Sequence, residues 1–284
     1  MSSVLYDVPG PRAKARNTVL TIISLIGLAA GLWYVYDALD QKNEWAGEKW
    51  KPFTTSDVWE NFLIPGIEAQ LKAFAFSSVL AIAFGLVFGV LRMSTNRWVR
   101  TAAGAVIEFF RAVPLLILMF FVYFGAQPLL GTTFDPLVAV VVGLTLYNGS
   151  VLAEVVRAGV NALPKGQSEA GLSIGMRPQQ VMNFILLPQG LRAMLPAVIA
   201  QLVVVMKDSS LGYIIGYTEL VRQVSYLSQY LLQASIVVAL IFLVINLSLS
   251  GLAVWVEKRL RTKGHTSAVV TVAPNIGEQG GGGA

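Results

Sequence analysis

The chain has 284 residues, of which 55% are hydrophobic and only 13% are charged, and its formal net charge is +5. Because a soluble globular protein carries about 25% charged residues, this composition excludes an ordinary soluble domain and indicates an integral membrane protein. The basic residues stand in short clusters at the ends of apolar runs, which is typical of membrane-helix orientation and not of nucleic-acid binding. Since the chain has no cysteine, disulfides and thiolate chemistry are excluded.

Apolar runs of roughly 20 residues are long enough to cross about 30 Å of hydrocarbon as helices. The sequence therefore predicts an all-α polytopic membrane protein with about six transmembrane helices, at about 18–37, 66–92, 101–125, 136–158, 181–206 and 231–256. Residues 1–17 precede the first run, which lacks the small-x-small pattern of a cleavage site. We therefore expect a retained N-terminal helix and not a signal peptide.

The distribution of Lys and Arg predicts the orientation of these helices. With both termini in the cytoplasm, most Lys and Arg residues fall on cytoplasmic segments, as the positive-inside tendency requires. The outer segment 38–65 contains Trp45, Trp50 and Trp59, which favour anchoring at the membrane interface over a binding site. The tail 259–284 has no periodicity and is predicted to be disordered.

A polar segment, 159–180, interrupts the apolar runs on the predicted cytoplasmic side. Ser168 can cap a short helix, Glu169 suits its positive end, and Gly175 can terminate it. Small residues leave little bulk on this helix, so another protein could approach it closely. The pattern predicts a docking element and not a catalytic one.

The same segment carries a family resemblance. Glu169-Ala170-Gly171, Gly175 and Ile185-x-Leu187-Pro188 resemble the motif EAA-x3-G-x9-I-x-LP of ABC-importer permeases, with Gly171 in place of the second alanine. The resemblance implies an ABC importer type I permease fold over 66–258, in which 159–180 is a coupling helix that docks on an ATPase. The coupling residues that it implies are Ser168, Glu169, Ala170, Gly171, Gly175 and Arg177.

Four further motifs narrow the resemblance. Residues 110–116 look like FRGTPLL, 153–159 like AEIFRGG, 186–190 like ILPQA and 206–211 like LKDTSL, which are motifs of polar amino-acid permeases. The chain is most similar to bacterial glutamate-uptake permeases with an extra N-terminal helix. Glutamine, or another polar or basic amino acid, remains the alternative substrate.

The resemblance also implies partners. It implies a bacterial plasma-membrane complex with a second permease, like or different, with two cytoplasmic ATPases, and with an extracytoplasmic amino-acid-binding protein. This chain has no G-x4-GK[ST] loop for ATP, and its one histidine, His265, lies outside the spans. We therefore expect no cofactor, metal or catalytic site on this chain, with ATP and Mg held by the ATPase. A nucleotide-independent channel and a membrane scaffold are the alternative classes.

Two clusters within the predicted spans could line a substrate pathway. Asn148-Gly149-Ser150 lies near the middle of its run, where polar residues beside a glycine can form a midplane site or serve close helix packing. Glu108-x-x-Arg111 and Glu154-x-x-Arg157 each put opposite charges one helical turn apart. Those pairs fit either an inner gate or local neutralisation.

A third cluster lies at the predicted outer end of the fifth span. Lys207, Asp208 and Ser209 could form an outer gate or meet the delivered substrate, or they could be a solvated helix end. The candidate pathway and gate residues are Arg111, Pro114, Asn148, Ser150, Glu154, Arg157, Lys207, Asp208 and Ser209.

Overall fold

The computed structural model describes residues 10–262, and all regular structure in that range is helical. The predictions for residues 1–9 and for 263–284, including His265, lie outside the described residues. The predicted disordered tail begins too early, because residues 259–262 belong to the last helix. The chain divides into two compact units, Met1–Ala73 with Ser209–Leu243, and Phe74–Asp208 with Val244–Ala284. Two long helices, α4 (Ile64–Arg92) and α12 (Leu231–Thr262), contribute residues to both units.

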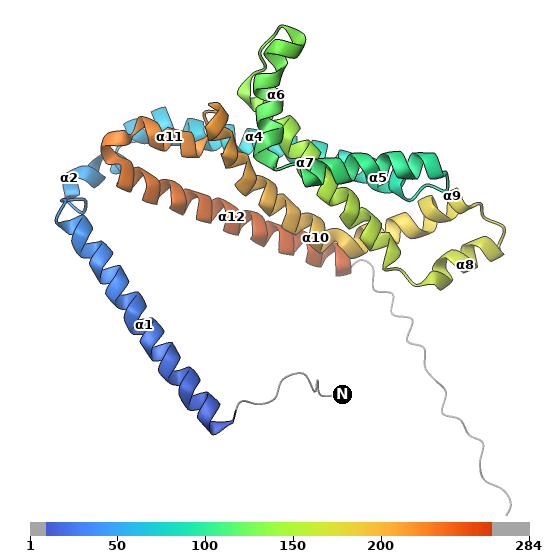
Figure 1. The fold of residues 1–284 in the computed structure, drawn as a ribbon, viewed down its shortest axis with the longest axis horizontal. Helices are drawn as coiled ribbons and strands as arrows, with labels where there is room; N and C mark the ends of the chain where they lie inside the picture. The colour runs from blue at the N-terminus through green and yellow to red at the C-terminus, as the bar shows by residue number, and fades with distance from the viewer. Residues whose placement is uncertain (1–9, 263–284) are drawn as a thin grey trace, which may run out of the picture. The chain divides into compact units, whose positions relative to one another are not determined.

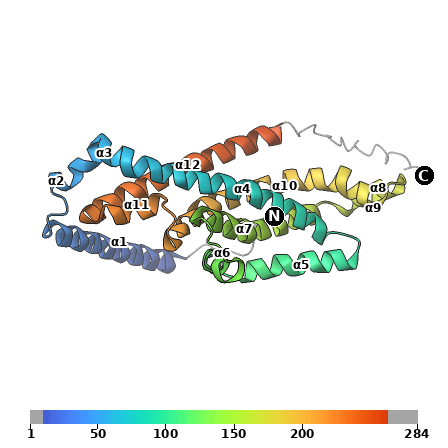
Figure 2. The same ribbon diagram turned by 90° about the horizontal axis from the view of Figure 1, so that it is seen from above.

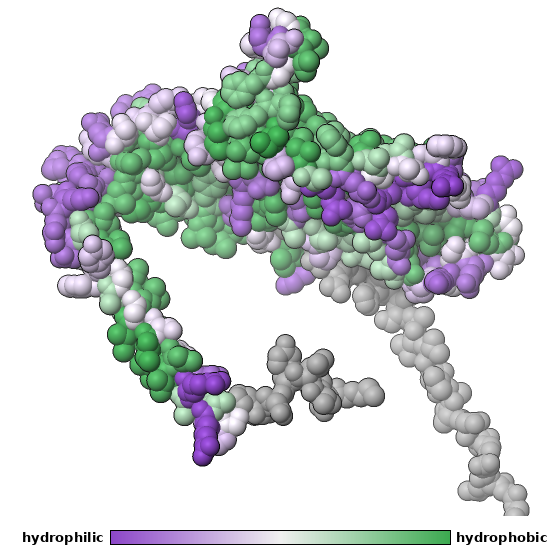
Figure 3. Space-filling model, in the orientation of Figure 1, coloured by the Kyte–Doolittle hydropathy of each residue, from purple (hydrophilic) through white to green (hydrophobic). Residues whose placement is uncertain are grey.

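The first unit contains the N-terminal helix and the predicted outer segments. Besides its parts of α4 and α12, its elements are α1 (Pro11–Asp40), α2 (Gly47–Trp50), η1 (Lys51–Thr54), α3 (Ser56–Val58), η2 (Trp59–Leu63), η4 (Ser209–Ile215), α11 (Leu220–Tyr226) and η5 (Ser228–Tyr230). No residue of α1 is buried. Its middle is hydrophobic on the face seen in Figure 3, as a helix inserted in lipid would be.

A tight polar contact fixes the turn that follows α1. The buried Gln233 of α12 donates from Nε2 to the carbonyl oxygen of Glu44 at 2.6 Å. The Glu44 carboxylate accepts a hydrogen bond from Lys49 Nζ at 2.8 Å. The carboxylate also accepts a hydrogen bond from Gln233 Nε2 at 3.2 Å. The hydrogen bonds to the carboxylate, the one from Lys49 foremost, hold the pKa of Glu44 below its ordinary value. Trp45 and Trp50 stack with ring centroids 6.3 Å apart, so these two tryptophans pack on one another, while Trp59 Nε1 donates to the Phe53 carbonyl at 2.9 Å.

The second unit holds most of the predicted transmembrane core. Besides its parts of α4 and α12, its elements are α5 (Arg97–Ala112), α6 (Leu115–Leu130), α7 (Pro136–Asn161), α8 (Lys165–Ser173), α9 (Pro178–Val181), η3 (Met182–Leu186) and α10 (Leu187–Asp208). The central helix is α7, which packs against α10, α6 and α5 and also meets α4 (Figure 2). Capping residues set helix starts: Asn96 accepts from the Trp98 N–H at the start of α5, and Asp135 from the Leu137 N–H at the start of α7.

Small residues let α4 and α7 approach closely. A Cβ added at Gly85 would lie 2.6 Å from Leu152 Cβ, and one added at Gly89 would lie 2.8 Å from Val156 Cβ. The two glycines are four residues apart and therefore lie on one face of α4. The backbones of α4 and α7 can pack at this distance only because both positions lack a side chain.

The predicted span at 101–125 is not one continuous helix. This segment forms two helices, α5 and α6, which meet at a 96° bend (Figure 1). Pro114 has no N–H to continue the ladder, and it holds Val113 in an extended conformation with φ −84° and ψ 127°. By length and composition, five helices of the described residues could cross a membrane, or six if this bent pair is one span. The other five predicted spans are confirmed as long helical segments.

Candidate functional site: the coupling segment and the polar pathway

The predicted coupling segment forms a short helix, α8, with a defined end. Gly175 has φ +85°, a conformation that glycine adopts without strain. Its N–H donates to the Leu172 carbonyl at 3.0 Å, and the Met176 N–H donates to the Gly171 carbonyl at 3.2 Å. This pair of bonds is the Schellman arrangement that satisfies the last carbonyls of a helix. The predicted role of Gly175 in ending the helix is confirmed.

The predicted start of this helix is wrong. Its N-cap is Pro164, which makes no side-chain cap, and α8 begins at Lys165. Ser168 therefore lies inside the helix and does not cap it, and Glu169 lies at its centre. Proline fixes the backbone at the first turn without needing a donor, so no polar cap is required for the chain to turn there.

One face of α8 is packed and the other is open. Gly171 is buried, and a Cβ added there would lie 2.9 Å from both Val181 Cγ2 and Ile185 Cδ1. This contact explains the glycine in place of the second alanine of the motif. On the other side Glu169 and Ala170 are exposed, and Ile174 is 78% exposed. The helix thus presents a small, partly apolar surface with one carboxylate, while Arg177 lies exposed beyond its end.

Replacement of Gly171 by leucine should destabilise the packing of α8 on η3. The added side chain must displace Val181 and Ile185, and such overpacking costs about 1–3 kcal/mol. The matched control is Gly166→Leu in the same helix, because no atom lies within 4 Å of a Cβ there. Thermal unfolding of the purified permease in detergent would compare the two. Equal midpoints would show that Gly171 is not confined as described.

A wider helical turn connects the coupling segment to α10. Residues Met182–Leu186 form a π-helical turn, η3, and Leu187 and Pro188 follow at the start of α10. Pro188 cannot donate to the carbonyl four residues earlier, and the turn before it is wide instead of α-helical. The Ile-x-Leu-Pro end of the motif therefore lies where regular α-helix gives way to a turn that can change its hydrogen bonding.

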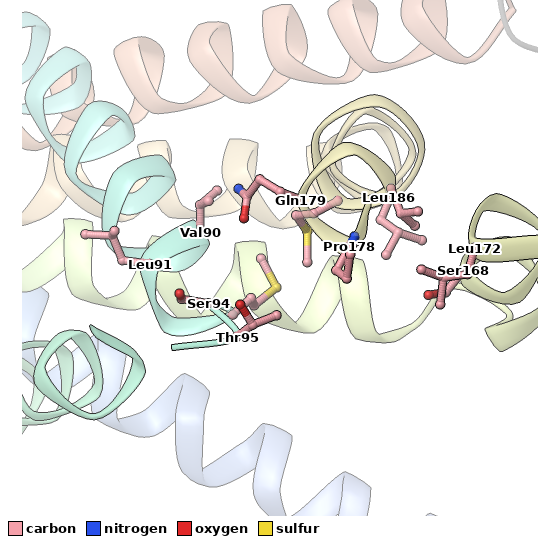
Figure 4. A pocket seen from close by; sticks show the side chains of 12 residues that line it. Val90, Leu91, Ser94, Thr95, Ser168, Leu172, Pro178, Gln179 and Leu186 are labelled. Carbon is pink, nitrogen blue, oxygen red and sulfur yellow. The ribbon is translucent and has the colours of Figure 1, made fainter. Parts of the chain in front are cut away.

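Cavities separate α8 from the end of α4. One, of about 230 Å³, lies between Val90, Leu91, Ser94 and Thr95 on one side and residues of α8, α9 and η3 on the other (Figure 4). A second cavity, of about 560 Å³, is lined by residues that include Arg92, Arg157, Lys165 and Ser168. The helix is held through Gly171, while unfilled space lies between it and the end of α4.

A network of four charges joins α4, α5 and α7. Arg92 contacts Glu108 at 2.6 Å through Nη2 and Glu154 at 2.9 Å through Nη1. Glu154 Oε2 also accepts hydrogen bonds from Arg157 at 2.8 Å and 3.0 Å. The predicted pair Glu154–Arg157 is confirmed. The predicted pair Glu108–Arg111 is wrong, because the Arg92 guanidinium reaches Glu108 from α4 and Arg111 is exposed.

The polar triplet in the middle of α7 divides between two neighbouring helices. Asn148 is fully buried, and its Oδ1 accepts a hydrogen bond from Gln201 Nε2 of α10 at 2.6 Å. Gly149 faces α4, where an added Cβ would lie 2.9 Å from Phe84. Ser150 donates to the Leu146 carbonyl of its own helix at 2.7 Å. The glycine thus serves helix packing, while Asn148 makes a polar contact whose partner the sequence analysis missed.

The third cluster surrounds the end of α10. Lys207 is exposed and Asp208 is half-buried at the last turn of that helix. In the first unit, Ser209 is buried and accepts a hydrogen bond from Gln70 Nε2 at 2.5 Å. Gly216 then turns the chain with φ +89°. Ser209 is therefore part of a packed polar contact and not of a solvated helix end.

Comparison with known families gives one match over most of the chain. Residues 81–262 match the family described as binding-protein-dependent transport system inner membrane component. The glutamate transport system permease protein GluD of Corynebacterium glutamicum is 44% identical over 237 residues, which are 82% of this chain and 87% of that protein. The arginine transport system permease protein ArtQ of Bacillus subtilis is 31% identical, over 71% of this chain and 93% of that protein.

Solved structures give the same fold. A chain of an amino-acid ABC transporter crystallised with histidines superposes with a TM-score of 0.66 at 28% identity, covering 71% of this chain and 95% of that one. An inward-facing MetNI methionine ABC transporter superposes with a TM-score of 0.60 at 23% identity, covering 70% of this chain and 95% of that one.

Proposed function

The chain belongs to the family of binding-protein-dependent transport system inner membrane components, and on that premise we propose that it forms the glutamate pathway of an ABC importer. It is a multi-pass membrane permease for amino acids, a translocation subunit and not an enzyme. The observation that carries the glutamate assignment is the identity of 44% to GluD over 82% of the chain, against 31% to the arginine permease.

The importer that we propose contains four kinds of protein component. This permease pairs with a second permease, two cytoplasmic ATPases bind ATP and Mg, and an extracytoplasmic protein delivers the amino acid. The exposed face of α8, with Glu169 and Ala170, is the ATPase-docking surface. The distribution of Lys and Arg supports cytoplasmic termini in a bacterial plasma membrane, and this chain itself binds no cofactor.

The proposed pathway runs past the polar groups of the second unit. Asn148 Nδ2 is buried with no hydrogen-bond partner among the described residues, and an unpaired buried donor is costly unless a water or a substrate meets it. Exposed Arg111, at the break before Pro114, offers a cation for a substrate carboxylate. The ion pairs of Glu154 and Arg157 form the proposed inner gate, and Ser150 lies between these groups on α7. Lys207, Asp208 and Ser209 form the proposed outer gate.

Competitive uptake tests the substrate assignment. The experiment measures uptake of labelled glutamate by cells that carry this permease with its ATPase and binding protein. Uptake is compared with and without an excess of unlabelled glutamate, aspartate, glutamine, histidine or arginine. We expect suppression by the acidic amino acids alone, and no uptake when the ATPase is omitted. Suppression by glutamine or arginine would contradict the glutamate assignment and would identify the competing amino acid as a substrate. Uptake that persists without the ATPase would favour a channel.

A further inference from the structure

A basic recess opens on the second unit beside the ion-pair network. Its volume is about 410 Å³, and residues of three helices line it: the end of α4, α5 and α7. The residues that line it are Arg92, Arg100, Thr101, Gly104, Ala105, Glu108 and Arg157. Arg92 is the last residue of α4, a helix of 29 residues, so the predicted orientation puts the recess near the cytoplasmic end of that helix.

The charges around this recess do not balance. Three guanidiniums line it, whereas only two carboxylates, Glu108 and Glu154, pair with them. Arg100 has neither carboxylate as a partner and donates from Nη1 to the Ser94 carbonyl at 3.2 Å. One positive charge, that of the exposed Arg100, is therefore left without a carboxylate partner among the residues that line the recess. A charge in such a position at the membrane is stabilised by an anion.

The face of α5 next to the recess is apolar and uncovered. Trp98 is 84% exposed and Phe109 is 60% exposed. Thr101 and Ala105 line the recess between them. The spacing 98, 101, 105 and 109 keeps all four on one side of the helix. Two aromatic side chains thus flank a shallow strip of small residues, and tryptophan is favoured at the membrane interface.

We propose that this recess binds the phosphate of an acidic phospholipid, whose acyl chain lies along the strip between Trp98 and Phe109. Arg100 supplies the positive charge that neither carboxylate neutralises, and Arg157 and Thr101 offer further donors. The combination of a guanidinium recess with an adjoining apolar face distinguishes a lipid from a free anion, because a soluble phosphate would gain nothing from the exposed aromatic side chains. The site stands apart from the coupling surface and from the Asn148–Gln201 contact, and it shares Arg157 with the proposed inner gate.

Native mass spectrometry of the purified importer, incubated with phosphatidylglycerol or phosphatidylcholine, tests this site. Arg100→Gln removes the unbalanced charge, and Arg97→Gln is the matched control, because Arg97 is an exposed cation on the same turn of α5 that does not line the recess. We expect Arg100→Gln to weaken phosphatidylglycerol binding about fivefold, the effect of one basic residue near an anionic lipid. Arg97→Gln and Arg100→Lys should change it little.

Three outcomes would overturn the proposal. If Arg97→Gln weakened phosphatidylglycerol binding as much as Arg100→Gln does, the attraction would be a general one of the basic surface. If phosphatidylcholine bound as well as phosphatidylglycerol, the site would not require an acidic headgroup. Displacement of the lipid by millimolar inorganic phosphate would identify the ligand as a free anion. Glutamate uptake by Arg100→Gln, measured in parallel, reports whether the importer is assembled, so loss of lipid binding in an active importer can be assigned to the recess.

Discussion

Replacement of Glu169 by arginine should lower ATP-driven uptake more than about tenfold, because reversing a charge at the proposed docking surface would cost several kcal/mol. The side chain is exposed at the centre of α8, so its replacement removes no buried contact. An exposed substitution of this kind usually changes folding stability by less than about 0.5 kcal/mol. The expected loss is therefore a loss of the interaction with the ATPase.

The measurement pairs uptake in cells with recovery of the purified complex. Glu60→Arg is the control, because Glu60 is also an exposed carboxylate, in the segment before α4, and its replacement changes the net charge by the same amount. We expect Glu169→Arg to give a folded permease that copurifies poorly with the ATPase, and Glu60→Arg to behave like the original protein. Normal uptake by the Glu169→Arg permease would contradict the proposal that α8 docks on the ATPase.

The long helices could be predicted from the sequence, because apolar length alone determines whether a segment can span a membrane. The break between α5 and α6 could not be predicted in this way, since the apolar run continues through Val113 and Pro114. The signal was present in the proline itself, which restricts the residue before it. Hydrophobicity measures length and does not detect where the backbone turns.

The ends of α8 show the same limit at the scale of one helix. Gly175 was predictable, because a positive φ at a helix end favours glycine whatever surrounds it. The start of α8 was not predictable in this way. Ser168 has the side chain of a typical N-cap, but the helix already begins after Pro164. The burial of Gly171 depends on Val181 and Ile185, so its role in packing follows only from the folded chain.

The charge network was the least predictable feature. Neighbours one turn apart can be paired from sequence spacing, and this predicts Glu154 with Arg157. Arg92 joins Glu108 and Glu154 from a different helix, across 16 and 62 positions of the chain. No local pattern indicates such a partner, because the close approach of α4 to α7 brings them together. That approach depends in turn on the glycines of α4.

Replacement of Gly85 by leucine should prevent recovery of a folded permease. The first side-chain atom alone would lie 2.6 Å from Leu152 Cβ and 3.2 Å from the Gly149 carbonyl oxygen. Neither α4 nor α7 can yield there without separating along this face, and overpacking of this kind costs about 1–3 kcal/mol or more. Separation would also draw Arg92 away from Glu154, which leaves charges without partners at an additional cost.

Fluorescence-detected size-exclusion chromatography would measure the yield and thermal stability of Gly85→Leu. The control is Gly27→Leu in α1, where an added Cβ has no atom within 4 Å. The two substitutions add the same apolar side chain to a long apolar helix, so a difference between them reports packing and not hydrophobicity. We expect a monodisperse peak for Gly27→Leu and aggregation or severe loss for Gly85→Leu. Similar recovery of both would contradict the close packing of α4 on α7, and with it the geometry that holds the proposed inner gate.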